Sequence, residues 1–338
     1  MVENTFVIKV FDVLIFSAIL AFMVSVGLTF AFIRWMRKVE LGQYMRQYGP
    51  DIHMHKQGTP TMGGVVFVAI TSVFFLIYSD ISPSGWFVFS AMLLFASIGL
   101  VDDLLKFFWK DAKGLKARYK FLLQAVAVFI LFLIFQITEH TMYLPGLDLS
   151  FSLKGLGLMI WFYLMFSGCT HAFNLTDGLD GLASGIGIIA LGSLGIIAAW
   201  QGQADIVFLI LIFAFTVLGF LWFNRHPAQI FMGDTGSFAM GGLVAAIAYS
   251  MGLELYLFLF ALIPVLETLS VALQLIFYRF TRKRIFKIAP FHHHFEAARG
   301  VDYAYILPTI EWPERRITAT FWTAATLSAS LGLMLYFG

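Results

Sequence analysis

Ten long apolar runs divide this 338-residue chain, and they constrain its fold more than any other feature. Crossing the hydrocarbon core of a bilayer takes about 20 apolar residues as a helix, whereas the strands of a membrane barrel would alternate apolar and polar residues. These runs do not alternate, and only 12% of the residues are charged, against about 25% in a soluble domain. The sequence therefore predicts an all-α polytopic membrane protein, one domain over residues 1–338, with transmembrane helices at roughly 10–33, 62–79, 86–101, 119–137, 155–173, 182–200, 206–223, 237–252, 254–278 and 317–336.

The basic residues indicate which way these helices run. Of the 22 Lys and Arg residues, all but Lys9 and Lys154 fall in the loops after the first, third, seventh and ninth runs. Positive charge marks the cytoplasmic side of a membrane protein, so both termini are expected on the outer side. Topology alone is a sufficient reason for most of these charges, and attraction of an anionic lipid or a phosphorylated substrate is a second one. The loops expected at the cytoplasmic face are 34–61, 102–118, 174–181, 224–236 and 279–316.

The unusual polar motifs of the chain all fall in the same five loops. The topology rests on Lys and Arg alone, so this coincidence supports it independently. The outer loops carry no comparable cluster. The sequence therefore predicts a functional site at the cytoplasmic face, built from GTPTMGG (58–64), DDLLK (102–106), NLTDGLDGL (174–182), NRHPAQIFMGDTGS (224–237) and PFHHHFE (290–296).

Five carboxylates in these motifs are candidates for chemistry. Asp102 and Asp103 end an apolar run, where they either face solvent or serve a divalent cation or a proton transfer. Asp177 and Asp180 share a face if their segment is helical, and the neighbouring glycines allow a ligand to approach the backbone closely. Asp234 stands between glycines at an expected helix start, where it caps the helix or binds Mg²⁺ beside a phosphate.

Two further features stand apart from the carboxylate motifs. Three consecutive histidines, 292–294, are spaced too closely to bind one metal together, but imidazoles in a basic segment suit hydrogen bonds to phosphate. Glu267 lies inside an apolar run, where an ionisable residue is either functional or hydrogen-bonded between helices. Pro264, three residues earlier, is expected to bend the ninth helix.

Together these parts indicate phosphoryl chemistry on a lipid. Carboxylates for Mg²⁺, Gly-rich turns, lysines and histidines position phosphates and neutralise their charge. A membrane transporter is the alternative from another class. Transporters tend to bind their substrates near the midplane, between internal repeats, and here the motifs gather at one surface without a convincing repeat.

The ordered set DDLLK, NLTDGLDGL, FMGDTGS and PFHHHFE resembles the polyprenyl-phosphate N-acetylhexosamine-1-phosphate transferases, over roughly residues 34–336. GTPTMGG and the histidine triplet are similar to the branch of that family that uses UDP-N-acetylmuramoyl-pentapeptide. The resemblance implies that undecaprenyl phosphate attacks the β-phosphate of this donor with Mg²⁺ present, so that UMP leaves and lipid I forms for peptidoglycan synthesis. Physics of the residues does not name the sugar, and a relative that uses UDP-N-acetylglucosamine is the alternative.

The resemblance also implies a location, an assembly and a mechanism. The active site would face the cytoplasm from the bacterial inner membrane, with both termini periplasmic, and many members form homodimers. A dianionic lipid phosphate needs little help from a base, which favours direct attack over a covalent aspartyl intermediate. The bent ninth helix resembles the groove that holds the lipid.

Site residues are implied only where this chain matches the family motifs. Asp234 matches the Mg²⁺ ligand, and Asp102 and Asp103 match an essential pair near the lipid phosphate or the metal. Phe231 matches an aromatic residue that stacks on uracil. The remaining implied contacts are Asn174, Asp177 and Asp180 for the nucleotide sugar, His292, His293 and His294 for the pyrophosphate, and Lys56, Lys120, Asn224 and Gln274 for substrate in general.

Overall fold

A computed structural model describes residues 2–39, 56–78, 80–109, 114–147, 149–297, 301 and 303–338 of the chain. Parts of the expected loops 34–61, 102–118 and 279–316 lie outside these residues, whereas every site residue predicted above lies within them. The elements follow in the order α1 (Val2–Lys38), α2 (Gly64–Ile77), α3 (Pro83–Trp109), α4 (Ala117–Ile134), β1 (Glu139–Tyr143), β2 (Ser150–Lys154), α5 (Gly155–Thr176), α6 (Leu182–Trp200), α7 (Ala204–Asn224), α8 (Gly233–Ser250), η2 (Glu254–Tyr256), α9 (Leu257–Phe260), α10 (Leu262–Thr281), η3 (Phe291–His294) and α11 (Glu314–Phe337).

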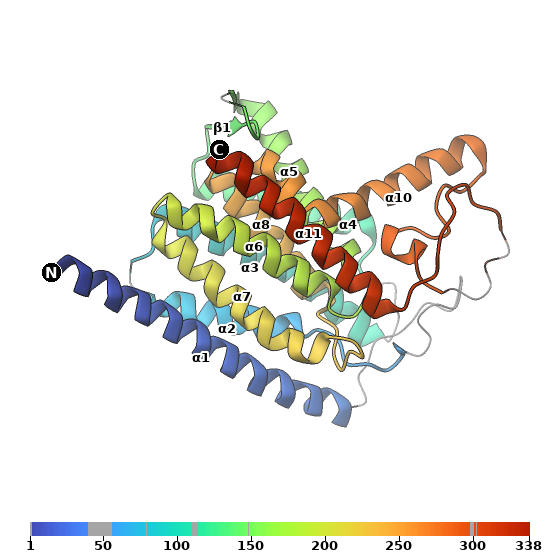
Figure 1. Ribbon diagram of the computed structural model, residues 1–338, viewed down its shortest axis with the longest axis horizontal. Helices are drawn as coiled ribbons and strands as arrows, with labels where there is room; N and C mark the ends of the chain where they lie inside the picture. Colours follow the sequence, from blue (N-terminus) through green and yellow to red (C-terminus); the bar gives the residue numbers. More distant parts are fainter. Residues whose placement is uncertain are drawn as a thin grey trace.

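Helix forms in each of the ten predicted apolar runs, which confirms an all-α polytopic membrane protein (Figure 1). Among the described residues, eight helices are long and apolar enough to cross a membrane: α1, α3, α4, α5, α6, α7, α10 and α11. The helix α2 has 14 residues and rises about 21 Å at 1.5 Å per residue. The count of ten spans and the outer position of both termini stay predictions.

The helix α8 is the centre of the bundle and packs against α3 and α5 (Figure 1). Its side chains are buried without interruption from Asp234 to Tyr249. Small residues let neighbouring helices approach closely, and α8 is rich in Gly and Ala. A Cβ added at Gly99 of α3 would overlap the main chain of Asp234, and one at Gly64 of α2 would overlap Gly236. Three helices thus meet at the N-terminus of α8.

The ninth apolar run is broken, as predicted from Pro264. Its first part forms η2 and α9, and the break falls at Ala261, where φ is −120° and ψ is 36°. Pro264 then lies in the first turn of α10, where its missing N–H costs no helical hydrogen bond. Figure 1 shows α10 diverging from the other helices of the bundle.

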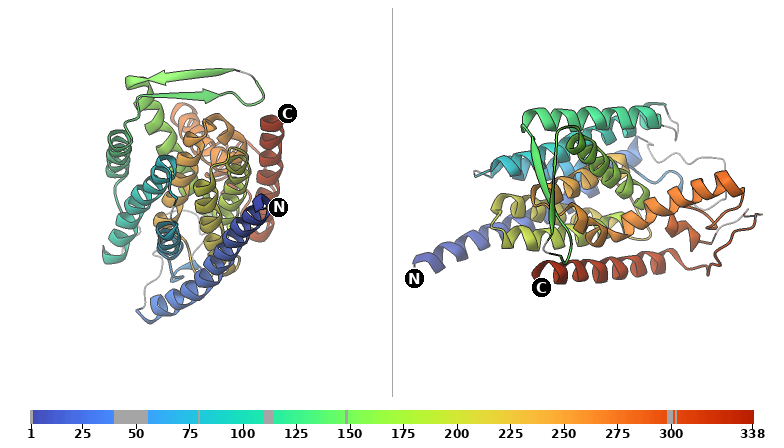
Figure 2. Two further views of the ribbon diagram at one scale, coloured as in Figure 1. Left: turned by 90° about the vertical axis from the view of Figure 1, so that its left-hand side faces the viewer. Right: turned by 90° about the horizontal axis from the view of Figure 1, so that it is seen from above.

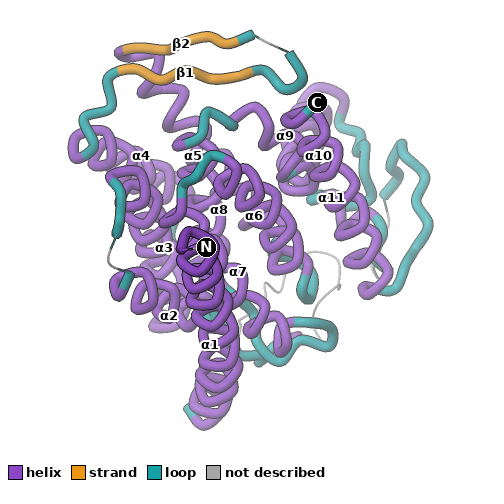
Figure 3. Tube along the Cα trace, turned by 60° about the vertical axis from the view of Figure 1, so that its left-hand side comes forward, coloured by secondary structure: helices purple, strands orange, loops and turns teal. Residues whose placement is uncertain are grey.

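A β-hairpin, absent from the sequence prediction, lies across the other end of the bundle (Figures 2 and 3). Its strands β1 and β2 pair antiparallel, from Glu139 opposite Lys154 to Tyr143 opposite Ser150. The Nζ of Lys154 lies 2.9 Å from Oε2 of Glu139. The hairpin lies near the C-terminal end of α11, far along that helix from Glu314: a Cβ added at Gly146, in the hairpin turn, would lie 3.1 Å from the side chain of Leu335.

Candidate active site

Three carboxylates meet where the end of α3 reaches the start of α8. Asp102 and Asp103 lie in the last turns of α3, and Asp234 is the second residue of α8. All three are buried, and one oxygen of each lies within 4.8 Å of the others. The first N–H groups of a helix have no acceptor inside the helix. For α8, the carboxylate of Asp103 is that acceptor. It accepts hydrogen bonds from the N–H of Asp234 at 3.0 Å and from the N–H and hydroxyl of Thr235 at 2.8 and 2.7 Å.

Two lysines neutralise part of this carboxylate cluster. The Nζ of Lys106 lies 2.5 Å from Oδ2 of Asp102 and 3.1 Å from Oδ1 of Asp234. The Nζ of Lys120, from the first turn of α4, lies 2.6 Å from Oδ2 of Asp234 and 3.1 Å from Oδ1 of Asp102. Buried carboxylates are costly unless they are paired, and these four contacts meet that need.

The last turn of α5 and the loop that follows it complete one side of the carboxylate cluster. Asn174 donates through Nδ2 to Oδ1 of Asp234 at 3.1 Å and to Oγ of Ser237 at 3.0 Å. Burial raises the pKa of Asp177 well above its usual range, and the carboxylates of Asp234 and Asp103 add to the rise. Asp177 is therefore in the field of the carboxylate cluster although it makes no direct bond to it among the described residues.

The donor set of the carboxylate cluster fits a magnesium ion. Mg²⁺ prefers oxygen ligands, and it is usually held by one or two carboxylates together with substrate phosphates. Asp102, Asp103 and Asp234 each offer one carboxylate oxygen, from two helices, and Lys106 and Lys120 lie beside them, where they can pair with phosphate oxygens. Such a set suits phosphoryl transfer, which depends on positioning and on neutralisation of charge.

A second buried cluster surrounds Lys56. Its Nζ lies 2.7 Å from Oδ1 of Asp180 and 2.6 Å from Oε1 of Glu314. The same glutamate oxygen accepts the N–H of Asp180 at 2.7 Å. His226 approaches through Nδ1, 3.0 Å from Asp180 and 3.4 Å from Glu314. The Lys56 cluster thus joins four segments that are far apart in the chain.

Pairing shifts the pKa values in the Lys56 cluster in opposite directions. Burial opposes the charge of Lys56, but the carboxylates of Glu314 and Asp180 outweigh it and raise the pKa of Lys56. Burial alone would raise the pKa of Asp180, but Lys56 and the N–H of Ala228 lower it. Both groups are therefore charged at neutral pH.

The three predicted histidines have separate partners. His292 is fully buried, and its N–H donates to Oε1 of Glu267 at 3.2 Å. His293 contacts Glu296 through Nδ1, and Nδ1 of His294 accepts the N–H of Lys287 at 3.0 Å. Glu267, predicted to be functional or bonded between helices, thus anchors the histidine turn η3 to α10.

Glycine at position 178 brings the histidine turn against the loop 174–181. A Cβ at Gly178 would overlap the ring of His292, so a side chain there would push η3 away. The sequence suggested that these glycines let a ligand approach the backbone. At Gly178 the group that approaches is the imidazole of His292. The loop 174–181 therefore contacts the carboxylate cluster, the Lys56 cluster and η3.

Three other predicted contacts lie around the same face. Asn224 donates to the carbonyl of Ile230 at 2.9 Å, and Oε1 of Gln274 accepts the N–H of Ile285 at 2.9 Å. Both amides thus hold the loops that follow their helices. Phe231 has its ring 5.9 Å from Nζ of Lys56. Their contacts with a substrate stay predictions.

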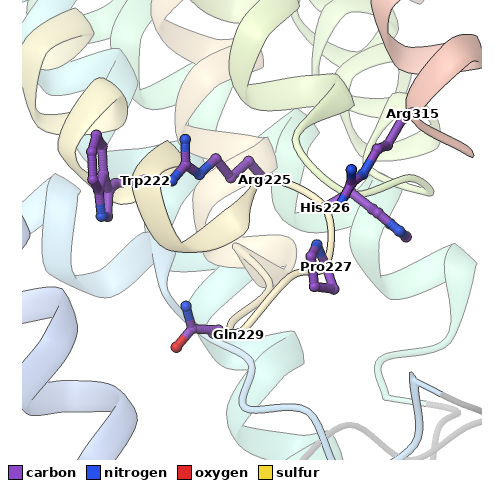
Figure 4. A pocket seen from close by; sticks show the side chains of 6 residues that line it. All are labelled: Trp222, Arg225, His226, Pro227, Gln229 and Arg315. Atoms are coloured by element: carbon purple, nitrogen blue, oxygen red, sulfur yellow. The ribbon is translucent and has the colours of Figure 1, made fainter.

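A cavity of about 590 Å³ opens beside the Lys56 cluster (Figure 4). The predicted site motif NRHPAQIFMGDTGS (224–237) contains four residues of its lining, but the sequence assigned no role to any of them, His226 included. Trp222, Arg315 and Glu314 were not predicted as site residues. Only a weak signal in the sequence indicated that Glu314 and His226 belong to the site. Glu314 follows Pro313 at the start of a helix, and His226 precedes Pro227. The cavity is lined by Trp222, Arg225, His226, Pro227, Gln229 and Arg315.

Comparison with known proteins gives two family models and many relatives. The model described as glycosyl transferase family 4 matches residues 85–252, and phospho-N-acetylmuramoyl-pentapeptide-transferase signature 1 matches residues 56–68. A phospho-N-acetylmuramoyl-pentapeptide-transferase of Bacillus pumilus is 40% identical, over 96% of this chain and 98% of the relative. Proteins of that name from Bacillus subtilis and Listeria monocytogenes are each 38% identical, over 96% and 93% of this chain and 98% and 95% of the relative.

Proposed function

This chain belongs to the phospho-N-acetylmuramoyl-pentapeptide-transferase family, and on that premise we propose the reaction that it catalyses in peptidoglycan synthesis. The donor is UDP-N-acetylmuramoyl-pentapeptide, the acceptor is undecaprenyl phosphate, and the products are lipid I and UMP. The single observation that supports this most strongly is the buried cluster of Asp102, Asp103 and Asp234 with two lysines at one end of a membrane bundle.

The reaction transfers a phosphosugar between two phosphates. An oxygen of the lipid phosphate attacks the donor phosphorus that carries the sugar, and the bond from that phosphorus to the bridging oxygen breaks. UMP leaves with the bonding electron pair. The second pKa of a phosphate monoester is about 6, so the acceptor is already largely a dianion at neutral pH, and a direct attack needs no strong base.

The proposed roles of the residues follow from their places. Asp234, Asp102 and Asp103 would hold Mg²⁺, which supplies neutralisation of the pyrophosphate when it is bound. Lys106 and Lys120 are placed to contact phosphate oxygens beside it. The other predicted residues would contact the substrates from the same end of the bundle: Asn174, Asp177, Asp180, Lys56, Asn224 and Phe231 would face the nucleotide sugar, and Gln274, His292, His293 and His294 would face the pyrophosphate and the lipid.

The proposed orientation places this site at the cytoplasmic face of the bacterial inner membrane. A soluble nucleotide sugar and a membrane-bound lipid phosphate can meet only at a membrane surface. The end of the bundle with the carboxylate cluster also carries the basic helix ends, such as Arg37 and Lys38 of α1, and positive charge favours the cytoplasm. A homodimer stays a prediction of the family resemblance.

The experiment that tests this proposal measures UMP release by the purified protein in detergent. Undecaprenyl phosphate and Mg²⁺ are supplied, with UDP-N-acetylmuramoyl-pentapeptide and UDP-N-acetylglucosamine in parallel assays. We expect UMP from the first donor alone, and loss of the activity in EDTA with recovery on added Mg²⁺. Release from the second donor alone would assign the other sugar, and release from neither by the folded protein would refute the transferase function.

A further inference from the structure

The cavity shown in Figure 4 is cationic and has no role in the reaction described so far. Arg225 follows the last residue of α7, and Arg315 is the second residue of α11. With His226 they supply the ionisable groups of the lining, and no acidic residue of the described part of the chain belongs to it. The cavity therefore favours an anionic ligand.

Two features keep these arginines ready for a ligand. The guanidinium of Arg225 lies over the indole of Trp222 at 4.5 Å, a contact that holds a cation in place without neutralising it. Arg315 lies in the first turn of a helix, where the helix dipole disfavours a cation. Among the described residues, neither guanidinium is ion-paired with a carboxylate. Both retain the forked donors that bind a carboxylate through two hydrogen bonds.

The cavity continues from the Lys56 cluster. His226 lines the cavity, and its Nδ1 lies 3.0 Å from Asp180. Arg315 is the neighbour of Glu314 in the chain, and Arg225 is the neighbour of Asn224. If the donor is held at the Lys56 cluster, the part of the donor that extends beyond this cluster would therefore lie beside the two arginines.

We propose that this cavity binds a carboxylate of the peptide carried by the donor. The inference rests on the proposed function, which supplies a peptide-bearing donor. The volume of about 590 Å³ lies within the usual range of small-molecule sites, about 300–1,000 Å³, and it exceeds what a single lipid phosphate needs. Arg315, beside His226, and Arg225, whose guanidinium points toward Trp222 in Figure 4, each offer a guanidinium to a peptide carboxylate, and Trp222 and Gln229 form the adjoining wall.

The first arm of the test changes the donor and leaves the protein intact. UMP release is compared for UDP-N-acetylmuramoyl-pentapeptide and for the same donor with its peptide carboxylates converted to amides. We expect kcat/KM to fall about tenfold on amidation, mainly through KM, which is the scale of one charge-assisted contact. Equal kcat/KM for the two donors would overturn the inference while the transferase function stands.

The second arm changes the arginines. Arg225→Gln and Arg315→Gln should each reduce the preference for the acidic donor to about twofold or less, because the contact is then missing for both donors. Arg316→Gln is the matched control, since Arg316 also lies over a tryptophan, Trp312, at 4.8 Å but does not line the cavity. The ratio of kcat/KM for the acidic donor to kcat/KM for the amidated donor should be the same in Arg316→Gln as in the wild type.

The other outcomes are also decisive. Equal losses for both donors in the two cavity variants, with normal folding and insertion, would show a structural role and overturn the inference. A change confined to KM for undecaprenyl phosphate, or to activation by vesicles of anionic phospholipid, would assign the cavity to a lipid and overturn it too. No UMP from the wild type with any donor would instead refute the proposed function.

Discussion

Gly99 of α3 determines how closely α3 approaches the start of α8, so replacing it tests how the carboxylate cluster is positioned. A Cβ at this position would overlap the main chain of Asp234 and would lie 2.6 Å from the backbone nitrogen of Thr235. Ordinary van der Waals contact begins near 3.4 Å. The nearest atom, the carbonyl oxygen of Asp234, would lie only 2.2 Å from this Cβ, so Gly99→Ala must separate the two helices locally by about 1.2 Å to restore ordinary contact, with an overpacking cost of about 1–3 kcal/mol.

This displacement acts directly on Asp103. Its hydrogen bonds to Asp234 and Thr235 measure 2.7–3.0 Å, so an added separation of about 1.2 Å would take them beyond the length of a hydrogen bond. Misplacement of reacting groups by about 1 Å can lower a rate about 100-fold. We expect kcat for UMP release to fall by about this factor in Gly99→Ala while the protein remains folded.

Gly168→Ala in α5 is the matched control for this prediction. It makes the same change inside a membrane helix, but a Cβ there would have no atom of the described residues within 4 Å. We expect kcat within twofold of the wild type for this variant. Circular dichroism and gel filtration in detergent would establish folding of both. Near wild-type turnover by folded Gly99→Ala would refute the argument that close approach of α3 and α8 positions the carboxylates.

Two further predictions concern the loop 174–181 and the Lys56 cluster. Asp177→Ala and Asp180→Ala should each lower UMP release at least about 100-fold while the protein stays folded and inserted, and normal turnover by both would exclude a functional role. The lowered pKa of Asp180 stabilises the fold fully above the ordinary aspartate pKa of about 3.9, and this contribution is lost as pH falls through the pKa of the folded state. The difference in thermal midpoint between wild type and Asp180→Asn should therefore be constant from pH 5 to 9 and shrink below about pH 4; a constant difference down to pH 3 would contradict the pairing with Lys56.

The sequence predicted the convergence of Asp102, Asp103 and Asp234 because two simple rules fix where they lie. Apolar length defines the helices, and the distribution of Lys and Arg indicates which helix ends share a face. Residues at those ends are then neighbours even when they are more than 100 positions apart in sequence. The break of the ninth helix followed in the same way from Pro264, because proline acts locally on the backbone.

The members of the Lys56 cluster were harder to predict because they depend on long-range packing. Glu314 lies in no Gly-rich or histidine motif, and it reaches Lys56 only because α11 packs against α6. The family resemblance implied substrate contacts for Gln274 and Asn224, and the structure adds that their amides hold adjacent backbone, an arrangement that residue type alone does not reveal. The β-hairpin was missed because two five-residue strands give little pattern beside ten long apolar runs.

The balance of charge in the carboxylate cluster leads to a prediction about the order of binding. Three carboxylates face two lysines, which leaves one surplus negative charge when all are ionised. A donor pyrophosphate is also negative, and like charges in a buried site repel strongly. The donor should therefore bind weakly until a divalent cation is present, so the cation binds first.

Replacing one carboxylate by its amide removes the surplus charge and separates binding from catalysis. In EDTA, Asp234→Asn should bind UDP-N-acetylmuramoyl-pentapeptide more tightly than the wild type, by about tenfold for one charge contact, although its UMP release with Mg²⁺ should be nearly abolished. Calorimetric titration of both proteins with and without Mg²⁺ measures this directly. Weaker binding by Asp234→Asn than by the wild type in EDTA would show that Asp234 attracts the donor through its neighbours rather than repelling it, and the charge argument would then fail.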